Sequence, residues 1–265
     1  MQLSSALKET LIKTAHLLAD AAGEAILPHF RSLDLPTDNK DSSGYDPVTV
    51  ADRAAEKAMR KVLAELRPED AILGEEFGHK AGTSGLTWVL DPIDGTRAFV
   101  CGAPTWGVLV AVNAGAAPLF GLIDQPFTQE RYSGGFGEAL WQRGSESNSI
   151  ATRAAKPLSE AILLTTFPEI GSPEQRRTFE RVRDRVQLTR YGLDCYGYAL
   201  LAAGQVDLVI EAGLAPYDIQ GPMAIVEAAG GVVTDWEGGP ADGGGTVIAA
   251  ANAEIHAEAL SAMQA

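Results

Sequence analysis

The sequence has few cysteines, few basic residues and no long apolar run. Only two of its 265 residues are cysteines, Cys101 and Cys195, and they form neither a CxxC pair nor a cluster with histidine at zinc-ligand spacing. Two cysteines provide no disulfide framework in a chain of this length, which favours the reducing cytoplasm. Residues 1–23 resemble an amphipathic helix interrupted by charges, without the continuous apolar core of a signal peptide. No run is long enough to span a bilayer, so we expect no membrane partner.

Basic residues are outnumbered by acidic ones, 21 against 35, which gives a formal net charge of -14. Binding to the phosphate backbone of a nucleic acid needs a basic face, so this balance opposes a nucleic-acid partner. It is compatible with a small anionic substrate, because a bound metal ion can invert the local field. Hydrophobic residues make up 46% of the chain, enough for a full-sized core in one large domain or two closely packed ones.

Apolar residues at helical spacing predict helices, and short apolar runs broken by Gly, Pro or Asp predict strands. The predicted helices cover about 5–30, a segment that opens at 49–52, 174–185, 196–203, 219–229 and the C-terminal residues. The predicted strands are 71–73, 88–90, 108–112, 119–123, 162–164, 208–210, 232–233 and 247–248, and residues 38–44 are a predicted loop. Because this order lacks a strict βαβ period, it favours a layered α/β/α architecture. The polar residues 143–150 suggest a junction between halves 1–145 and 146–265, packed as one unit.

The most informative segment is the strand at 88–90 followed by Asp91-Pro92-Ile93-Asp94-Gly95-Thr96. Pro92 stiffens the bend and Gly95 permits a tight turn, so two carboxylates and a carbonyl can converge on one point. Hard cations such as Mg²⁺ prefer this ligand set. Asp-Pro and Asp-Gly are also ordinary turn formers, so the segment alone leaves both interpretations open.

Two further acidic positions follow the same logic. Glu75 and Glu76 come directly after the strand at 71–73, where an acidic pair is more often simply solvated. Asp218 lies at the start of a predicted helix, where it can act as N-cap, as metal ligand, or as both.

Together, Gly74-Glu75-Glu76, the 91–96 segment, and Tyr217-Asp218 followed by 227–231 resemble the inositol monophosphatase superfamily over about residues 45 to 236. The resemblance implies a layered α/β/α/β/α sandwich of the inositol monophosphatase and sugar phosphatase type. It implies two or three Mg²⁺ ions per site, with Mn²⁺ as an alternative, and a homodimer. The metal ligands that it implies are Glu75, Asp91, the backbone oxygen of Ile93, Asp94 and Asp218.

The same resemblance implies catalytic roles. Thr96, hydrogen-bonded to Asp46, orients the attacking water, and Glu75 assists as base. The backbone N–H groups of Gly95 and Thr96 bind the phosphate at the start of a helix. No protein nucleophile is needed, so we expect Cys101 and Cys195 to be packing residues.

Residues 190–204 and 121–126 resemble the histidinol-phosphate phosphatase branch more than the inositol branch. Asp194 stands where inositol phosphatases carry a small residue, and a carboxylate there suits a cationic substrate. Glu211 falls where the family contacts the substrate beyond the phosphate, and Arg190, which opens the segment, is also predicted to bind substrate. Asp194 is alternatively a helix N-cap.

The sequence also departs from this branch. Ala98 and residues 102–104 do not match its pattern, and Pro222 is unexpected in the first turn of a helix.

We therefore predict a Mg²⁺-dependent phosphomonoesterase that hydrolyses histidinol phosphate to histidinol and phosphate in histidine biosynthesis. An inositol-1-monophosphatase or a broad sugar-phosphate phosphatase is the alternative. A non-catalytic metal- or phosphate-binding regulator is a third reading, opposed by the complete ligand set.

Overall fold

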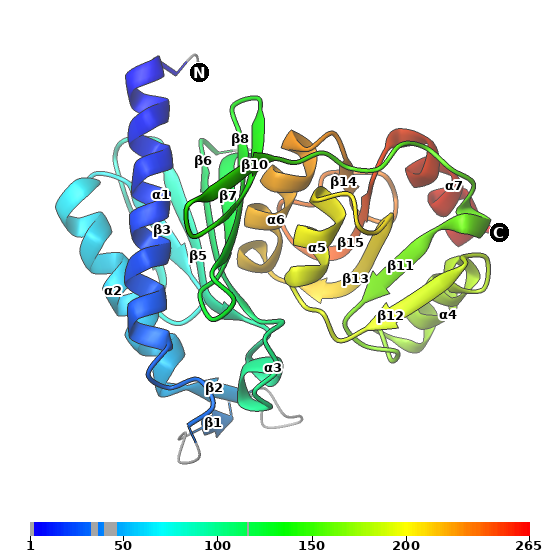
Figure 1. The fold of residues 1–265 in the computed structure, drawn as a ribbon, viewed down its shortest axis with the longest axis horizontal. Helices are drawn as coiled ribbons and strands as arrows, with labels where there is room; N and C mark the ends of the chain where they lie inside the picture. The colour runs from blue at the N-terminus through cyan, green and yellow to red at the C-terminus, as the bar shows by residue number, and fades with distance from the viewer. Residues whose placement is uncertain (1–2, 33–36, 40–46, 116) are drawn as a thin grey trace.

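The computed structural model describes residues 3–32, 37–39, 47–115 and 117–265. Within them, two β-sheets and three layers of helices alternate, and Figure 1 shows the layers side by side. This confirms the predicted α/β/α/β/α sandwich. No helix in these ranges is both long and apolar enough to cross a membrane.

The first sheet has eight strands in the order β10-β9-β8-β7-β6-β5-β3-β4. Only β3 and β5 pair in parallel within it; the other neighbours are antiparallel. Its strands are β3 (Ala71–Gly74), β4 (Gly78–Lys80), β5 (Thr87–Asp94), β6 (Gly107–Asn113), β7 (Pro118–Gln125), β8 (Glu130–Gly135), β9 (Glu138–Arg143) and β10 (Glu146–Ser149). A separate antiparallel pair consists of β1 (Thr37–Asn39) and β2 (Pro47–Thr49). Residues 38 and 39 of the predicted 38–44 loop belong to β1, and the rest of that loop lies outside the described ranges.

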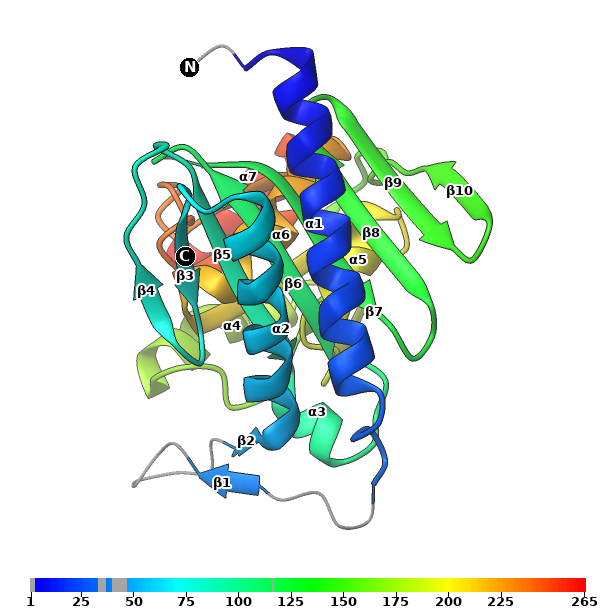
Figure 2. The ribbon, with the colours of Figure 1, turned by 90° about the vertical axis from the view of Figure 1, so that its left-hand side faces the viewer.

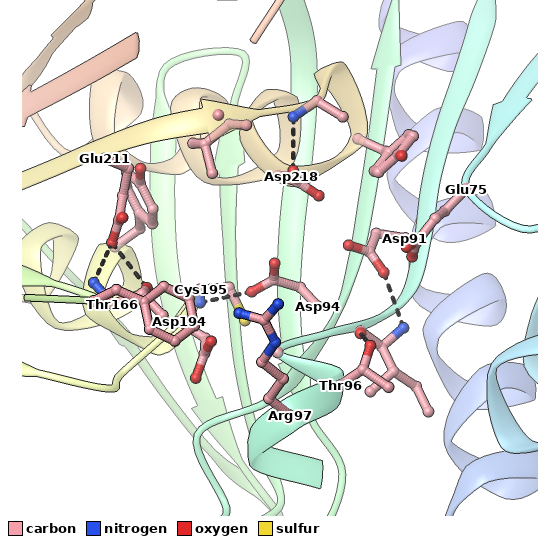
Figure 3. Close-up of a pocket in the computed structure, with 18 of the residues that line it drawn as sticks. Glu75, Asp91, Asp94, Thr96, Arg97, Thr166, Asp194, Cys195, Glu211 and Asp218 are labelled. Carbon is pink, nitrogen blue, oxygen red and sulfur yellow. Dashed lines mark hydrogen bonds between the residues drawn. The ribbon is translucent and has the colours of Figure 1, made fainter. Parts of the chain in front are cut away.

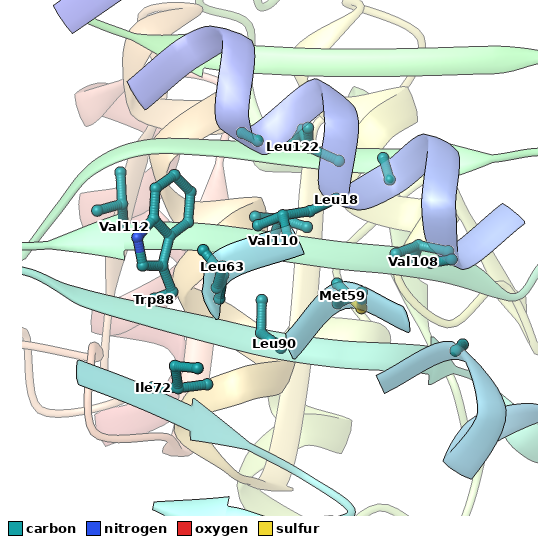
Figure 4. Close-up of a cluster of buried hydrophobic side chains, with 14 of the residues drawn as sticks. Leu18, Met59, Leu63, Ile72, Trp88, Leu90, Val108, Val110, Val112 and Leu122 are labelled. Carbon is teal, nitrogen blue, oxygen red and sulfur yellow. The ribbon is translucent and has the colours of Figure 1, made fainter. Parts of the chain in front are cut away.

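The outer face of this sheet is covered by α1 (Ser5–Ile26) and α2 (Val50–Leu66), as Figure 2 shows. Thr49 begins α2 with a capping box, in which Asp52 accepts from the Thr49 backbone N–H. Met59 and Leu63 of α2 are fully buried with Trp88 of the sheet (Figure 4), so both belong to the core.

The second sheet has the order β12-β11-β13-β15-β14, and in it β11 runs parallel to both of its neighbours. Its strands are β11 (Ile162–Thr165), β12 (Leu188–Tyr191), β13 (Leu208–Leu214), β14 (Val232–Thr234) and β15 (Gly245–Ala250). Helices α4 (Pro173–Arg183) and α7 (Ala253–Gln264) cover its outer face, and a short 3-10 helix at Leu158–Glu160 precedes it.

The layer between the two sheets consists of α5 (Tyr196–Ala202) and α6 (Pro216–Ala228), and a third short helix, α3 (Thr96–Val100), follows β5. Helix α6 lies almost in backbone contact with β7: a Cβ added to Gly121 would lie 2.5 Å from the carbonyl oxygen of Gly221. The absence of a side chain at Gly121 therefore sets how closely α6 approaches the first sheet.

The predicted junction at 143–150 coincides with the β9–β10 hairpin of the first sheet. The chain leaves this sheet after Ser149 and enters the second at Ile162. The division into halves at 145/146 stays a prediction.

Candidate active site

The two aspartates at the end of β5 face the same space because the strand is irregular there. Asp91 pairs with Leu109 and Asp94 with Gly107, so three steps on β5 oppose two on β6. Side chains three residues apart in a regular strand point to opposite faces, and a bulge corrects that alternation. Asp91 and Asp94 thereby line one pocket of about 350 Å³ (Figure 3).

The turn after Asp94 is held by local hydrogen bonds. The Ile93 N–H donates to Asp91 Oδ1 at 3.0 Å, and the Thr96 hydroxyl donates to the Ile93 carbonyl at 3.1 Å. Gly95 adopts φ +80°, a left-handed conformation that favours glycine, and caps the start of α3. The turn therefore presents the predicted phosphate-binding residues Gly95 and Thr96 to the pocket.

Glu75 reaches the pocket from the end of β3, next to β5. The turn that follows it is held by the fully buried Glu56 of α2, which accepts from the Glu76 N–H at 2.6 Å and from Arg60 Nε at 2.7 Å. Glu56 is thus a positioning residue that the sequence analysis did not identify. The sequence feature that could have identified it is a charged residue among the apolar residues of the buried face of α2, next to Ala55.

Asp218 enters from the opposite side, on α6. The helix begins at Pro216, three residues earlier than predicted, so Asp218 is its third residue and not its N-cap. The Asp218 carboxylate accepts from the Ala215 N–H at 2.7 Å, which satisfies one donor of the first turn. Because the helix begins earlier, Pro222 lies in its interior, and the expectation that Pro222 belongs to the first turn is wrong.

Asp91, Asp94 and Asp218 form a cluster in which one carboxylate oxygen from each lies within 4.8 Å of the others. Burial raises the pKa of Asp91 well above its usual range, and the charges of Glu75, Asp94 and Asp218 raise it further. Burial likewise raises the pKa of Asp94, with the charges of Asp218 and Asp194 adding to the effect. Like charges at this spacing in a dehydrated site call for a cation between them.

The donor set fits a hard divalent cation, since it consists of carboxylates with the Ile93 carbonyl nearby. Asp91, Asp94 and Asp218 would hold such an ion, with Glu75 and Ile93 at the Asp91 end of the pocket. When bound there, such a cation would supply Lewis-acid chemistry to a phosphate ester, since it would polarise phosphoryl oxygens, acidify a water and offset the charge of the departing alkoxide. The chain itself orients the ligands, through the N–H of Cys195 to Asp94 Oδ2 at 2.7 Å and that of Ala215 to Asp218.

A second group of carboxylates lines the other side of the pocket. Asp194, at the start of α5, has a pKa raised to about 6 by burial, while a hydrogen bond from the Thr105 hydroxyl and the charge of Arg97 act in the opposite direction. Its side chain does not cap α5, whose N-cap is Cys195 without a side-chain bond, so the alternative N-cap interpretation is wrong. The Asp194 carboxylate is therefore available to a ligand in the pocket.

Glu211 on β13 is 7% exposed and lines the same pocket. It accepts from the Thr166 N–H at 2.6 Å, from the Thr166 hydroxyl at 2.9 Å and from the Thr165 hydroxyl at 3.3 Å. Burial raises its pKa to about 7 against the effect of these bonds, and the charge of Asp194 adds to the rise. Thr165, Thr166 and Glu211 lie on or just after parallel strands of the second sheet, toward their carboxyl ends, where ligands commonly bind in α/β sheets.

One predicted site residue lies away from the pocket. Arg190 is exposed on the edge strand β12 and does not line the pocket. Asp46 lies outside the described residues, so its hydrogen bond to Thr96 stays a prediction. The roles assigned to the other residues also stay predictions, although all of them line the pocket.

Several pocket residues were not predicted as site residues, among them Arg97, Thr166, Phe167 and Tyr198. The Arg97 guanidinium lies over the Phe167 ring at 5.0 Å from its centroid, so a contact between α3 and the loop after β11 spans the pocket. Of these residues, Thr166 could have been predicted, because polar residues 165–166 directly follow the strand predicted at 162–164.

The sequence from residue 7 to 265 matches the model of the inositol monophosphatase family, and the chain belongs to that family. It is 41% identical over 274 aligned positions to the bifunctional phosphatase IMPL2, chloroplastic, of Arabidopsis thaliana, covering 99% of this chain and 78% of the relative. It is 34% identical over 251 positions to a histidinol-phosphatase of Mycobacterium tuberculosis, covering 94% and 95% of the two chains. A solved inositol monophosphatase from Zymomonas mobilis superposes with a TM-score of 0.85 at 39% identity, covering 99% of this chain and 100% of that one.

These matches confirm the predicted class. The protein is a metal-dependent phosphoric monoester hydrolase of the inositol monophosphatase family, acting on small phosphate esters.

Proposed function

We propose that the protein hydrolyses histidinol phosphate to histidinol and inorganic phosphate, a step of histidine biosynthesis. The observation that carries this proposal is the pair of carboxylates, Asp194 and Glu211, in the same pocket as the acidic metal cluster but separate from it. A histidinol moiety offers an ammonium and an imidazole, and each can donate to a carboxylate. A charge-assisted hydrogen bond contributes about 1.5–3 kcal/mol. The hydrogen bonds of a neutral polyol to the same carboxylates contribute less, because only one partner is charged.

The raised pKa values of the two carboxyls fit this proposal. Near neutral pH and without a ligand, Glu211, with a pKa of about 7, is partly protonated, whereas Asp194, with a pKa of about 6, is mostly ionised. A cationic group of the substrate beside these carboxyls would lower their pKa values and favour the ionised forms, which in turn attract the cation. Curated relatives named as histidinol-phosphatases support the same reading.

The alternative substrate is inositol-1-phosphate or a broad set of sugar phosphates. It is supported by the name of the Zymomonas mobilis structure and by the word bifunctional in the name of the Arabidopsis thaliana relative. The hydroxyl of Thr166 beside Glu211 would suit a polyol as well as an amine.

The proposal includes Mg²⁺ as the metal, with two or three ions per site and Mn²⁺ as an alternative, because the donors are hard oxygen atoms. Activity titrated with each metal after chelation would distinguish the two. A homodimer and a cytoplasmic location complete the proposal; the first is implied by resemblance and tested by light scattering, and the second fits two free cysteines.

The deciding experiment compares kcat/KM for histidinol phosphate and inositol-1-phosphate in the presence of Mg²⁺. A preference of about a hundredfold for histidinol phosphate, equal to about 2.7 kcal/mol, would support the proposal. A preference for inositol-1-phosphate would overturn the substrate while leaving the family and the class of reaction unchanged.

A further inference from the structure

Tyr198 of α5 carries a buried hydroxyl that has no hydrogen-bond partner within the described residues. Its side chain is only 3% exposed, and the residue lines the active-site pocket. A buried hydroxyl without a partner costs about 1–3 kcal/mol of stability. Because this hydroxyl belongs to a pocket residue, a ligand in the pocket is the natural source of the missing partner.

The electrostatic surroundings of this hydroxyl connect both sides of the pocket. Burial raises the pKa of Tyr198 well above its usual range, and the carboxylates of Glu211, Asp94 and Asp218 raise it further. The hydroxyl therefore keeps its proton. Two of those carboxylates belong to the predicted metal cluster and one to the proposed substrate wall, so Tyr198 is within electrostatic reach of both.

These neighbouring carboxylates already have donors of their own. Glu211 accepts from Thr165 and Thr166, and Asp94 accepts from the Cys195 N–H. Unlike these groups, a phenol hydroxyl can donate one hydrogen bond and accept another. It is thus suited to a polar group that arrives with the substrate.

We propose that the Tyr198 hydroxyl is a specificity-determining group that hydrogen-bonds a polar atom on the alcohol part of the phosphate ester. The proposed substrate class is the phosphate ester of an amino alcohol, in which two carbon atoms separate the ester oxygen from the ammonium nitrogen. The ammonium of such a substrate donates to Tyr198 Oη. The choice of an amine rests on the proposed function, whereas the hydrogen bond to the alcohol moiety does not.

The test uses Tyr198→Phe, which removes only the hydroxyl, and Tyr191→Phe as the matched control. Tyr191 is 37% exposed on β12 and does not line the pocket. Each variant is assayed with Mg²⁺ on histidinol phosphate, on inositol-1-phosphate and on phenyl phosphate, whose alcohol has no second polar group.

For Tyr198→Phe we expect kcat/KM on histidinol phosphate to fall by about 10-fold or more, a loss at least five times larger than that on phenyl phosphate. The Tyr191→Phe control should lose no more than about twofold on any of the three. Competitive inhibition by histidinol should weaken in Tyr198→Phe while inhibition by inorganic phosphate changes little. Equal losses on histidinol phosphate and phenyl phosphate, or an unchanged inhibition constant for histidinol, would overturn the inference.

Thermal unfolding separates a structural role from a binding role. Since the hydroxyl has no partner among the residues that the structure describes, Tyr198→Phe should unfold at the wild-type Tm or slightly above it. A Tm several degrees lower, together with equal losses on all esters, would show that the hydroxyl supports the fold and would overturn the inference.

The wild-type preferences test the proposed function separately. If the wild type prefers inositol-1-phosphate, the histidinol proposal fails. The Tyr198 inference would then be supported by a loss on inositol-1-phosphate larger than that on phenyl phosphate, and overturned by equal losses.

Discussion

The side chain of Asp194 occupies the space next to Gly95 so closely that a Cβ added to Gly95 would lie 2.9 Å from both Cβ and Cγ of Asp194. Gly95 belongs to the turn that carries the aspartates of β5, and Asp194 precedes α5. The two parts of the site, one facing the metal and one facing the organic group, are therefore in direct contact. Bulk added at Gly95 is expected to displace Asp194.

The first prediction concerns Gly95→Ala. The new methyl group would contact Asp194 in a left-handed backbone conformation, and we expect a loss of about 3 kcal/mol of stability or more, together with most of the activity. Gly85→Ala is the matched control, because Gly85 has φ +81° and no described neighbour lies within 4 Å of a Cβ added there. It should cost only about 1 kcal/mol and leave kcat unchanged. Similar chemical denaturation midpoints for both variants would contradict the packing argument.

The second prediction concerns Asp94→Asn. It removes one charge from the acidic cluster, so metal binding weakens and kcat should fall by about a thousandfold or more. Without metal, the variant should be as stable as the wild type or more stable, because one like charge is lost from a buried group. Asp184→Asn, an exposed change at the end of α4, serves as control. Turnover of Asp94→Asn at the wild-type rate would rule out the metal assignment.

The third prediction concerns Asp194→Asn, which keeps the shape of the side chain and removes its charge. We expect kcat/KM to fall by about 10- to 100-fold on histidinol phosphate and by less than about threefold on inositol-1-phosphate. Steady-state kinetics on both esters measure the difference. The same fractional loss on both would refute a role in charge recognition.

The fourth prediction concerns pH and Glu211. Its pKa in the folded protein is raised to about 7 from an ordinary value of 4.5, so the folded state binds its proton more tightly than the unfolded state. This contribution to stability is fully present below about pH 4.5 and is lost as the pH rises through about 7. By linkage it amounts to about 3 kcal/mol.

The measurement is urea denaturation from pH 4.5 to 8 in chelator, for wild type and Glu211→Gln. The wild type should lose stability over this range relative to the variant, with most of the difference developing between pH 5 and 7. Parallel stability curves for the two proteins would show that the Glu211 carboxyl does not titrate in this way.

Much of the fold could be predicted from local patterns. The apolar spacing of α2 and the short strands at 71–73 and 88–90 depend on neighbouring residues alone, and all three are found in the structure. The strands β8 to β10 were missed because they are polar and lie toward one edge of the sheet, where pairing with the neighbouring strand decides the conformation of each. The start of α6 was placed three residues late because Pro216 at its first position is compatible with a turn as well as a helix.

The site was predictable to the extent that its ligands lie in short motifs. Asp91, Asp94, Glu75 and Asp218 come from motifs at strand ends and a helix start, and all line the pocket. Tyr198 and Glu56 had the appearance of helix residues of no special role, and only the tertiary arrangement shows what surrounds them. Arg190 was predicted on segment resemblance, which does not specify which way an edge strand faces.

The near contact between Gly121 and the Gly221 carbonyl has a consequence for how this protein can change its substrate. On that side of the pocket the position of Asp218 depends on main-chain atoms of α6 packed against β7, and any side chain at Gly121 would displace the helix. On the other side the lining residues are side chains: Asp194 just before α5, Tyr198 on α5 and Glu211 on β13. A new preference among phosphate esters can therefore be acquired by point substitutions on one wall while the geometry that serves the phosphate is left as it is.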